Sequence, residues 1–390
     1  MKPDPLRIGF VPLVDAAPLV VAAEMGFAEE EGLKITLDAS SSWAALRDKL
    51  CFGQLDAAHM LSPVPVAGAL GLGGGGAELH ALSVLSVNGN VIGVSPEVAA
   101  TMRAAGHDFG FSDARAAGEA LIAARENLRV GVPFPFSMHA ELVYYWLSAL
   151  GLPAPQGIDV RTVPPPQMAE AIGAGEIDAF CVGEPWGSRS VENGVAELLL
   201  PGVAIWSLAP EKVLAVRSDW ADDNRDLSMR LIRAVWRAAR WLSAPESVGL
   251  ATEILSKPRY LGLAPELLER ALSGQFVINA RGERRVVDQF VEFHAGAVGF
   301  PWRSQAEWIG RQLALRTGLD RDASGEAAKA TYRSDLYRTA LAGVAHDLPS
   351  ASAKLEGAID TPLAVGSVGG RLILPRDRFF DGRIFEPSGE

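Results

Sequence analysis

The chain has 390 residues, of which 48% are hydrophobic, which is enough to build one large α/β unit or two domains rather than a disordered chain. Its 36 basic and 47 acidic residues give a formal net charge of -11, which repels nucleic acid and anionic lipid surfaces. The net charge therefore disfavours nucleic acid and anionic membranes as partners, and any site for an anion must be local.

Short strand-like runs alternate with helical patterns from the start of the chain. We predict strands near 6–10, 33–37, 56–60 and 81–85, and helices near 17–25, 42–52 and 64–70. Pro18 suits the first turn of its helix and Ser42 is a typical N-cap. This alternation predicts βαβ units and mainly parallel sheets.

A second series of the same kind follows Asn88-Gly89-Asn90. We predict strands near 129–132, 158–162, 178–182 and 204–207, and helices near 114–126, 139–150 and 166–174. The segments Gly53-Gln54-Leu55-Asp56-Ala57 and Gly175-Glu176-Ile177-Asp178-Ala179 resemble each other. Because glycine suits the left-handed position after a helix, they predict the same helix-to-strand turn in two lobes.

After Pro210 the pattern changes to one apolar strand, Val213 to Val216, and then to amphipathic helices. These helices are predicted near 223–243, 246–256, 264–273, 284–297, 303–316 and 326–346. The tail from Pro349 to Glu390 is rich in glycine and proline, but Phe379, Phe380, Ile384 and Phe385 would be costly to expose, so we predict that it packs on a lobe. Lobe I is predicted to comprise 1–90 and 210–390, and lobe II 91–209.

Motifs for nucleotide, zinc and serine-hydrolase chemistry are missing. The glycine run 71–76 satisfies G-x-G-x-x-G, but it follows a helix instead of a strand, so it predicts a flexible loop. Six histidines are scattered without metal-ligand spacing, and Cys51 and Cys181 offer no disulfide framework. We expect no cofactor, no metal and no enzymatic activity; a metal site assembled from distant residues is the alternative.

The N-terminus lacks the features of an export signal. Met1-Lys2-Pro3-Asp4-Pro5 leads directly into the strand that begins at Leu6, with no apolar segment between them. No apolar run approaches the roughly 20 residues that span a bilayer. If Met1 is the native start, these features predict a cytoplasmic protein with no membrane contact.

Several side chains with binding chemistry follow predicted strands. In open α/β sheets, ligands bind in the crevice beyond the carboxyl ends of the strands. We therefore expect one cleft lined by residues at those positions: Asp15, Trp43, Asn90, His139, Pro164, Pro165, Pro166, Glu184, Trp186 and Lys212.

The same positions carry a resemblance to a known family. The matching segments are Gly9 to Leu19, Ser42-Trp43 with Arg47-Asp48, Leu55 to Leu61, Val163 to Met168, Phe180 to Trp186 and Pro210-Glu211-Lys212. Over about residues 6–310 the chain resembles the nitrate- and bicarbonate-binding branch of the substrate-binding proteins of ABC transporters. The resemblance implies an α/β, two-lobed, periplasmic-binding-protein-like (type II) fold with a helical C-terminal extension and a ligand in the inter-lobe cleft.

Exported members of that branch carry a leader, which we do not find here. The chain therefore looks like the cytoplasmic nitrate/nitrite sensors of NasS type, which implies a NasT-type antiterminator partner and no direct contact with nucleic acid. The alternative is the substrate-binding component of an ABC transporter for nitrate, nitrite or bicarbonate. A third hypothesis is an enzyme, because thiamine-pyrimidine synthases have a similar fold, but two isolated cysteines disfavour it.

Nitrate is a planar, weak acceptor, so its site needs one or two cationic donors, neutral N–H donors and apolar walls. Lys212 is our candidate for the charge, His139 for a ring donor at a helix start and Trp43 for an indole donor. The alternatives are a surface lysine beside Glu211, an ordinary first-turn residue and a core tryptophan.

The resemblance adds further expectations. A lysine at position 212 marks nitrate or nitrite binders within the branch, where bicarbonate binders have an acidic residue. Asn90 stands where glutamine is expected and has less reach, and Pro164 and Pro165 are expected to form apolar wall or to stiffen a loop. We expect five other residues to be structural: Asp15 as a helix cap, Glu184 as a lobe-lobe salt-bridge partner, Trp186 as packing, and His59 and Cys181 as core.

Overall fold

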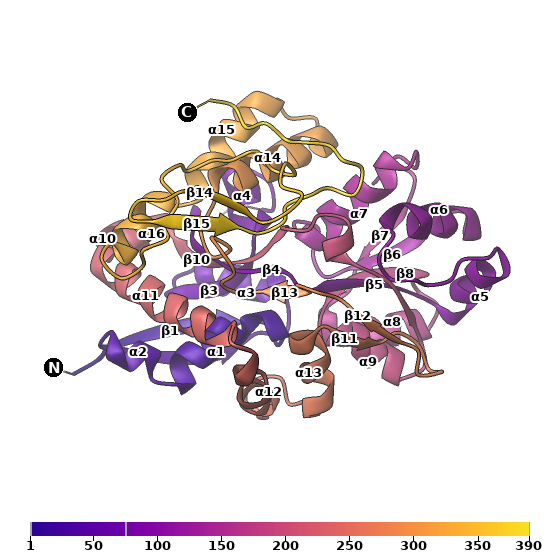
Figure 1. The fold of residues 1–390 in the computed structure, drawn as a ribbon, viewed down its shortest axis with the longest axis horizontal. Helices are drawn as coiled ribbons and strands as arrows, with labels where there is room; N and C mark the ends of the chain where they lie inside the picture. The colour runs from indigo at the N-terminus through magenta and orange to yellow at the C-terminus, as the bar shows by residue number, and fades with distance from the viewer. Residues whose placement is uncertain (1, 75, 390) are drawn as a thin grey trace.

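The computed structural model describes residues 2–74 and 76–389, which fold into two α/β lobes built on separate sheets (Figure 1). The first sheet has the strand order β13-β4-β10-β3-β1-β2. Its strands are β1 (Asp4–Phe10), β2 (Leu33–Ala39), β3 (Ala57–Leu61), β4 (Leu79–Asn88), β10 (Pro210–Arg217) and β13 (Val291–Glu292). Strand β1 is parallel to β2 and β3, whereas β10 is antiparallel to β3 and β4. The strands predicted in the first quarter of the chain are confirmed.

The second sheet has the order β7-β6-β8-β5-β9. Its strands are β5 (Asn90–Val94), β6 (Arg129–Val132), β7 (Asp159–Thr162), β8 (Ala179–Gly183) and β9 (Glu197–Pro201). The strand predicted at 204–207 is wrong, because the buried leucines 198–200 form β9 and the chain then turns through η3 (Gly202–Ala204). The two-lobed α/β fold itself is confirmed.

The chain passes between the sheets twice. Gly89, with φ +97°, joins β4 to β5, and residues 202–209 return the chain from β9 to β10. The first sheet thus takes its strands from 4–88, 210–217 and 291–292, and the second from 90–201. The residue boundaries of the lobes stay a prediction.

Helices cover both sheets, and the expected N-cap at Ser42 is present. Those of the first lobe are η1 (Val14–Ala16), α1 (Ala17–Glu24), α2 (Phe27–Glu30), α3 (Trp43–Cys51) and α4 (Pro63–Ala69). Those between the crossings are α5 (Pro96–Ala104), α6 (Ala114–Ala124), α7 (Met138–Ala149), η2 (Pro165–Gln167), α8 (Met168–Gly173) and α9 (Trp186–Glu192). Ser42 and Ser137 accept hydrogen bonds from Ala45 N and Ala140 N, which orients the first turns of α3 and α7. The glycine run at 71–76 follows α4, as expected, although Gly75 lies outside the described residues.

The repeated helix-to-strand turn is present in both lobes. Gly53 and Gly175 both have φ +70°. Three residues later, Asp56 accepts a hydrogen bond from Arg7 N at 2.7 Å and Asp178 accepts one from Arg129 N at 3.0 Å. Both turns therefore anchor the strand that follows to the first parallel strand of its lobe.

The C-terminal third is largely helical. Its elements are α10 (Ser218–Asp223), α11 (Arg225–Leu242), η4 (Pro245–Ser247), α12 (Val248–Ser256), α13 (Pro265–Ser273), β11 (Gln275–Val277), β12 (Arg284–Val286), α14 (Arg303–Thr317), α15 (Arg321–Thr331), α16 (Ser334–Leu341), β14 (Leu363–Gly366) and β15 (Arg371–Leu374). The helix predicted at 284–297 is wrong, since this segment supplies β12 and β13. The helix predicted at 326–346 is also wrong in extent, because the chain breaks between α15 and α16, where Arg333 N bonds to Ala81 O of β4.

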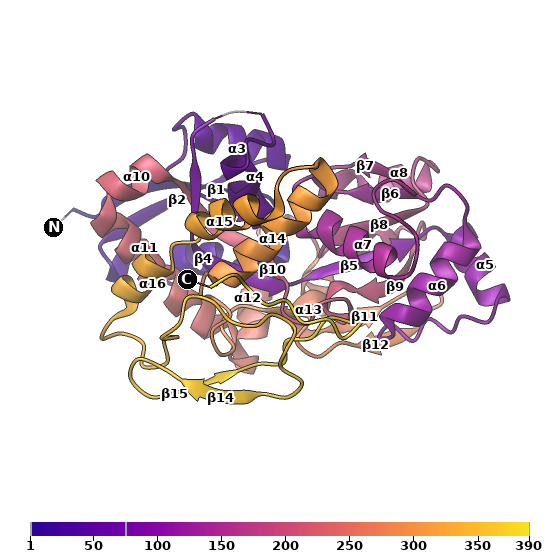
Figure 2. The same ribbon diagram turned by 90° about the horizontal axis from the view of Figure 1, so that it is seen from above.

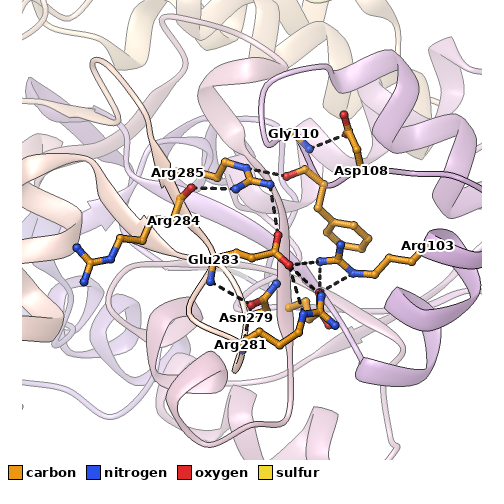
Figure 3. A network of polar contacts seen from close by, with 10 residues as sticks. Arg103, Asp108, Gly110, Asn279, Arg281, Glu283, Arg284 and Arg285 are labelled. Atoms are coloured by element: carbon orange, nitrogen blue, oxygen red, sulfur yellow. Dashed lines mark hydrogen bonds and ion pairs between the residues drawn. The ribbon is translucent and has the colours of Figure 1, made fainter.

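The hairpin of β11 and β12 lies against the second lobe (Figures 1 and 3). Arg285 donates to Phe109 O at 3.0 Å, and Leu198 N of β9 donates to Ile278 O at 2.7 Å. Glu283 lies 3.6 Å from the Arg103 guanidinium. Part of the segment 210–390 therefore contacts the lobe formed by 90–201.

The tail packs as predicted, with one exception. Phe379 is buried, and its ring stacks on Trp206 with 4.7 Å between the ring centroids. The centroid of the Trp308 ring lies 5.8 Å from that of Phe379. Figure 2 shows the course of the tail. Phe380 N donates to Ile205 O at 2.9 Å. Ile384 is 54% exposed, so the expectation of burial is wrong for that residue.

Candidate functional site

Lys212 lies in β10, at the centre of the first sheet, beside Glu211. Both side chains are fully buried, and Lys212 Nζ donates to Glu211 Oε1 at 3.0 Å. Successive side chains of a regular strand point to opposite faces. The pairing of β10 with β4 is irregular on both sides of Lys212, between Pro210 and Lys212 and again before Val213, and such irregularities redirect side chains. This local irregularity accounts for the proximity of the two neighbours.

Three further residues of the first lobe surround Lys212. Asp15 of η1 lies 2.8 Å from Lys212 Nζ through Oδ2 and 2.9 Å from His59 Nε2 through Oδ1. Trp43, the first residue of α3, lies with its ring centroid 5.5 Å from Lys212 Nζ and 5.4 Å from the His59 ring. All of these side chains are buried.

Two residues of the second lobe reach the same place. Asn90, the first residue of β5, donates its Nδ2 to Glu211 Oε2 at 2.8 Å. His139, in the first turn of α7, lies with Nδ1 3.0 Å from Glu211 Oε1. Glu211 thus contacts side chains from both lobes. We call the whole group the Lys212 cluster: Asp15, Trp43, His59, Asn90, His139, Glu211 and Lys212.

The charges of the cluster are strongly coupled. Burial alone would lower the pKa of Lys212, but Asp15 and Glu211 outweigh it and the pKa is raised. Burial would raise the pKa of Asp15, yet Lys212 and His59 lower it, so Asp15 is ionised. Burial raises the pKa of Glu211 to about 7 despite Lys212, and burial lowers the pKa of both His59 and His139. Near neutral pH Lys212 is therefore a cation and Asp15 an anion. The two histidine rings are neutral, and the carboxyl of Glu211 is partly protonated.

Several polar atoms of the cluster have no hydrogen-bond partner among the described residues. They include Trp43 Nε1, both ring nitrogens of His139 and Asn90 Oδ1. Such buried polar groups are costly and uncommon in folded proteins. The indole and imidazole nitrogens, together with the ammonium, are the donors that a small oxyanion needs. Their placement on both lobes suits a ligand held between them.

Four of the six predicted ligand residues lie together in the cluster: Trp43, Asn90, His139 and Lys212. Pro164 and Pro165 follow β7 at the edge of the second sheet, and the polar contacts of the cluster involve neither of them. Their role as apolar wall stays a prediction. Gly183 at the end of β8 was not singled out, although a Cβ there would lie 3.6 Å from His139 Nε2 and 2.8 Å from Leu13 Cδ2.

Three residues of this site have contacts that the sequence did not indicate. Asp15 makes no capping hydrogen bond to η1 or α1 and instead contacts Lys212 and His59, so the helix-cap expectation is wrong. His59 is buried as expected, but it is a member of the cluster. Glu211 was considered only as a neighbour of Lys212; an adjacent acid and base inside an apolar strand was the signal that would have identified it.

Glu184 and Trp186 join the lobes through hydrogen bonds, and Trp186 also packs against the apolar core, as expected. The Glu184 carboxylate accepts Ser188 N at 3.1 Å and forms no ion pair within residues 2–74 and 76–389, so the salt-bridge expectation is wrong. Its backbone makes the lobe contact instead, because Val14 N donates to Glu184 O at 3.0 Å. Trp186 Nε1 donates to Pro12 O at 2.9 Å. These bonds hold η1, which carries Asp15, against the end of β8.

Other kinds of site find less support. No group of three or more metal-ligating side chains occurs within the described part of the chain, and no helix there is long and apolar enough to cross a membrane. A cavity of about 500 Å³ lies beside α3 and α4 and is lined by Arg47, Cys51, Phe134 and Phe136. Its lining does not include the Lys212 cluster.

Comparison with known protein families agrees with this geometry. Residues 1–256 match the model of the NMT1-like family. The chain belongs to the NMT1-like family. This stretch contains every residue of the Lys212 cluster.

Individual relatives of this NMT1-like chain are named for nitrate. The nitrate/nitrite binding protein NrtA of Synechococcus elongatus is 29% identical over 397 residues, covering 98% of this chain and 84% of the relative. The nitrate import ATP-binding protein NrtC of Synechocystis is 32% identical over 336 residues, which is 79% of this chain but only 45% of that protein. The chain therefore spans less than half of this second relative.

Solved structures of the NMT1-like chain's relatives confirm the type of fold. The crystal structure of the periplasmic nitrate-binding protein NrtA from Synechocystis PCC 6803 aligns with a TM-score of 0.84 and 26% identity, covering 99% of this chain and 96% of that one. The alkanesulfonate-binding protein SsuA from Xanthomonas axonopodis pv. citri aligns at 0.53 and 20% identity over 70% of this chain and 84% of that one, which shows the fold alone. The predicted periplasmic-binding-protein-like architecture is confirmed.

Proposed function

We propose that this chain is a nitrate- or nitrite-binding protein of the substrate-binding-protein type, with its ligand at the Lys212 cluster. The observation that carries the proposal is a buried cation, Lys212, beside buried ring nitrogens that lack partners among the described residues: Trp43 Nε1 from the first lobe and the His139 ring from the second. The nitrate-binding names of the NrtA relatives support the same anion.

The affinity of such a site sets how many donors it needs. A micromolar dissociation constant corresponds to about -8 kcal/mol. Charge-assisted hydrogen bonds contribute roughly 1.5–3 kcal/mol each before the entropy of association is subtracted, so one lysine is insufficient and four or five contacts are required. The ammonium, the indole N–H and a ring N–H are three of these contacts.

The transporter role is the better supported one. Relatives named for nitrate import favour a substrate-binding component of an ABC transporter over a regulator. The cytoplasmic location and the NasT-type partner stay predictions, as does the absence of enzymatic activity. We therefore propose a role in transport, in which closing of the lobes presents the bound anion to a membrane complex.

A panel of anions tests the proposal. The midpoint of thermal unfolding is measured with nitrate, nitrite, bicarbonate, chloride and an alkanesulfonate at equal ionic strength. A ligand at 100 times its Kd adds about 2.7 kcal/mol of stability, which is a shift of several degrees. We expect the shift with nitrate or nitrite and not with the others. A shift confined to bicarbonate or the sulfonate would contradict the proposal.

A further inference from the structure

We propose that nitrate enters the Lys212 cluster together with one proton, which is held on the carboxylate of Glu211. This inference rests on the proposed function, and it assigns to Glu211 the role of setting which charge the site accepts. The proton comes from the solvent, so the site takes up the equivalent of a neutral pair.

Both carboxylate oxygens of Glu211 have polar or charged neighbours. Its Oε1 faces Lys212 Nζ and His139 Nδ1, both at 3.0 Å, and its Oε2 accepts Asn90 Nδ2 at 2.8 Å. The other titratable groups that act on it are Asp15 of η1 and Cys181 of β8, and Cys181 is buried with a pKa raised well above its usual range by burial. Lys212 is thus the one cation found against Glu211 in the described structure.

Counting charges shows why a proton is needed. Lys212 is already balanced by Asp15 at 2.8 Å. If Glu211 were also ionised, the fully buried cluster would have a net charge of -1 before any ligand arrived, and nitrate would make it -2. Uncompensated buried charge is strongly unfavourable. Protonation at Glu211 returns the cluster to neutral, so the incoming anion adds only its own charge.

Protonation of Glu211 also changes what His139 offers the ligand. The ring is neutral because burial lowers its pKa, so it carries one hydrogen, and neither ring nitrogen has a hydrogen-bond partner among the described residues. An ionised Glu211, with Oε1 3.0 Å from Nδ1, favours the hydrogen on Nδ1 by electrostatic attraction and leaves Nε2 as an acceptor that repels an oxyanion. Protonation of Glu211 removes that attraction, so the hydrogen can occupy Nε2, beside Gly183, and donate to the ligand.

The resting state is poised for this uptake. Burial raises the pKa of Glu211 to about 7, so the site is already protonated below that pH and must acquire a proton above it. Affinity for nitrate is therefore greatest at low pH and falls as pH rises through the free-protein pKa. For one coupled proton the limit is about tenfold per pH unit.

Calorimetry in buffers of different ionisation enthalpy measures the proton directly. Nitrate itself does not titrate between pH 6 and 9, so the dependence of the observed enthalpy on the buffer counts protons taken up by the protein. At about pH 7.5 we expect roughly three quarters of a proton for the unmodified chain, approaching one at higher pH. In Glu211→Gln, whose side chain cannot take up a proton, we expect almost none, together with an affinity that no longer falls as pH rises.

Glu292→Gln is the matched control. Burial also raises the pKa of Glu292 to about 7, but it lies in β13, paired with Val87 of β4, and is not a member of the cluster, so this variant should keep the uptake of the unmodified chain. Binding of nitrate without proton uptake from pH 6 to 8.5, or unchanged uptake in Glu211→Gln, would overturn the inference and leave the proposed function intact. If nitrate fails to bind at every pH, the proposed function falls and the inference with it. Should Glu211→Gln not fold, the pH profile of the unmodified chain decides alone.

Discussion

Lys212 carries the positive charge of the site, and its neighbours decide whether that charge is available. The sequence located it, because a lysine between apolar residues of β10 is conspicuous, and it also located Trp43, Asn90 and His139 at strand ends. Asp15 and Glu211 were not identified as site residues. Asp15 had a local explanation as a helix cap, and Glu211 had one as the strand neighbour of Lys212. Only the irregular pairing of β10 and the approach of η1 bring both carboxylates onto Lys212.

Gly183 allows a close test of the cleft. Its φ lies outside the left-handed region, so alanine is compatible with the backbone, but the new methyl would lie 2.8 Å from Leu13 Cδ2 and 3.6 Å from His139 Nε2. We expect Gly183→Ala to fold and to bind nitrate at least tenfold more weakly in calorimetry, a loss of about 1.4 kcal/mol. Gly249→Ala, where a Cβ meets nothing within 4 Å, is the control. Equal affinity in both variants would argue against a ligand beside His139.

Whole elements follow from the sequence where periodicity and caps agree. The βαβ units of both lobes, with Ser42 as N-cap and the glycine turns at 53 and 175, were predictable on those grounds. The segment 284–297 was not, because its apolar residues fit both a helical and a strand spacing. The turn at Gly282, with φ +81°, and the pairing of β12 with β11 select the strand.

The tail packs through contacts with residues that are distant in the sequence. Phe379 is buried against Trp206 and Trp308, and Trp206 lies in the segment that returns the chain from β9 to β10. We expect Phe379→Ala to lower the free energy of unfolding by about 3–5 kcal/mol in urea denaturation. Ile384→Ala, at a residue that is 54% exposed, should change it by less than about 0.5 kcal/mol. Similar losses in both variants would show that the tail is not fixed through the aromatic stack.

At the scale of the molecule, the C-terminal third contacts both lobes. Arg316 of α14 lies 2.7 Å from Glu141 of α7, and Tyr145 donates to Asp381 of the tail at 2.8 Å. With the hairpin of β11 and β12, these contacts add to the two crossings that join the sheets (Figures 1 and 2). Opening of the cleft must therefore break contacts outside it.

The net charge of the chain makes anion capture depend on the Lys212 cluster. A protein with a net charge of -11 does not attract anions generally, so specific capture depends on one buried cation and its donors. Lys212 is therefore expected to contribute strongly to binding, and the other lysines of the lobe are expected to have no role in it. Lys49, which pairs with Asp38 at 3.2 Å, is a suitable reference.

Nitrate titration of Lys212→Gln beside Lys49→Gln is the most direct test. Glutamine keeps a donor and removes the charge; because Asp15 and Glu211 lose their cation, both variants are first checked for folding by circular dichroism. We predict a tenfold to hundredfold weaker affinity for Lys212→Gln, as expected for the loss of one charge-assisted contact, and an unchanged affinity for Lys49→Gln. A folded Lys212→Gln that binds nitrate as tightly as the unmodified chain would contradict the account.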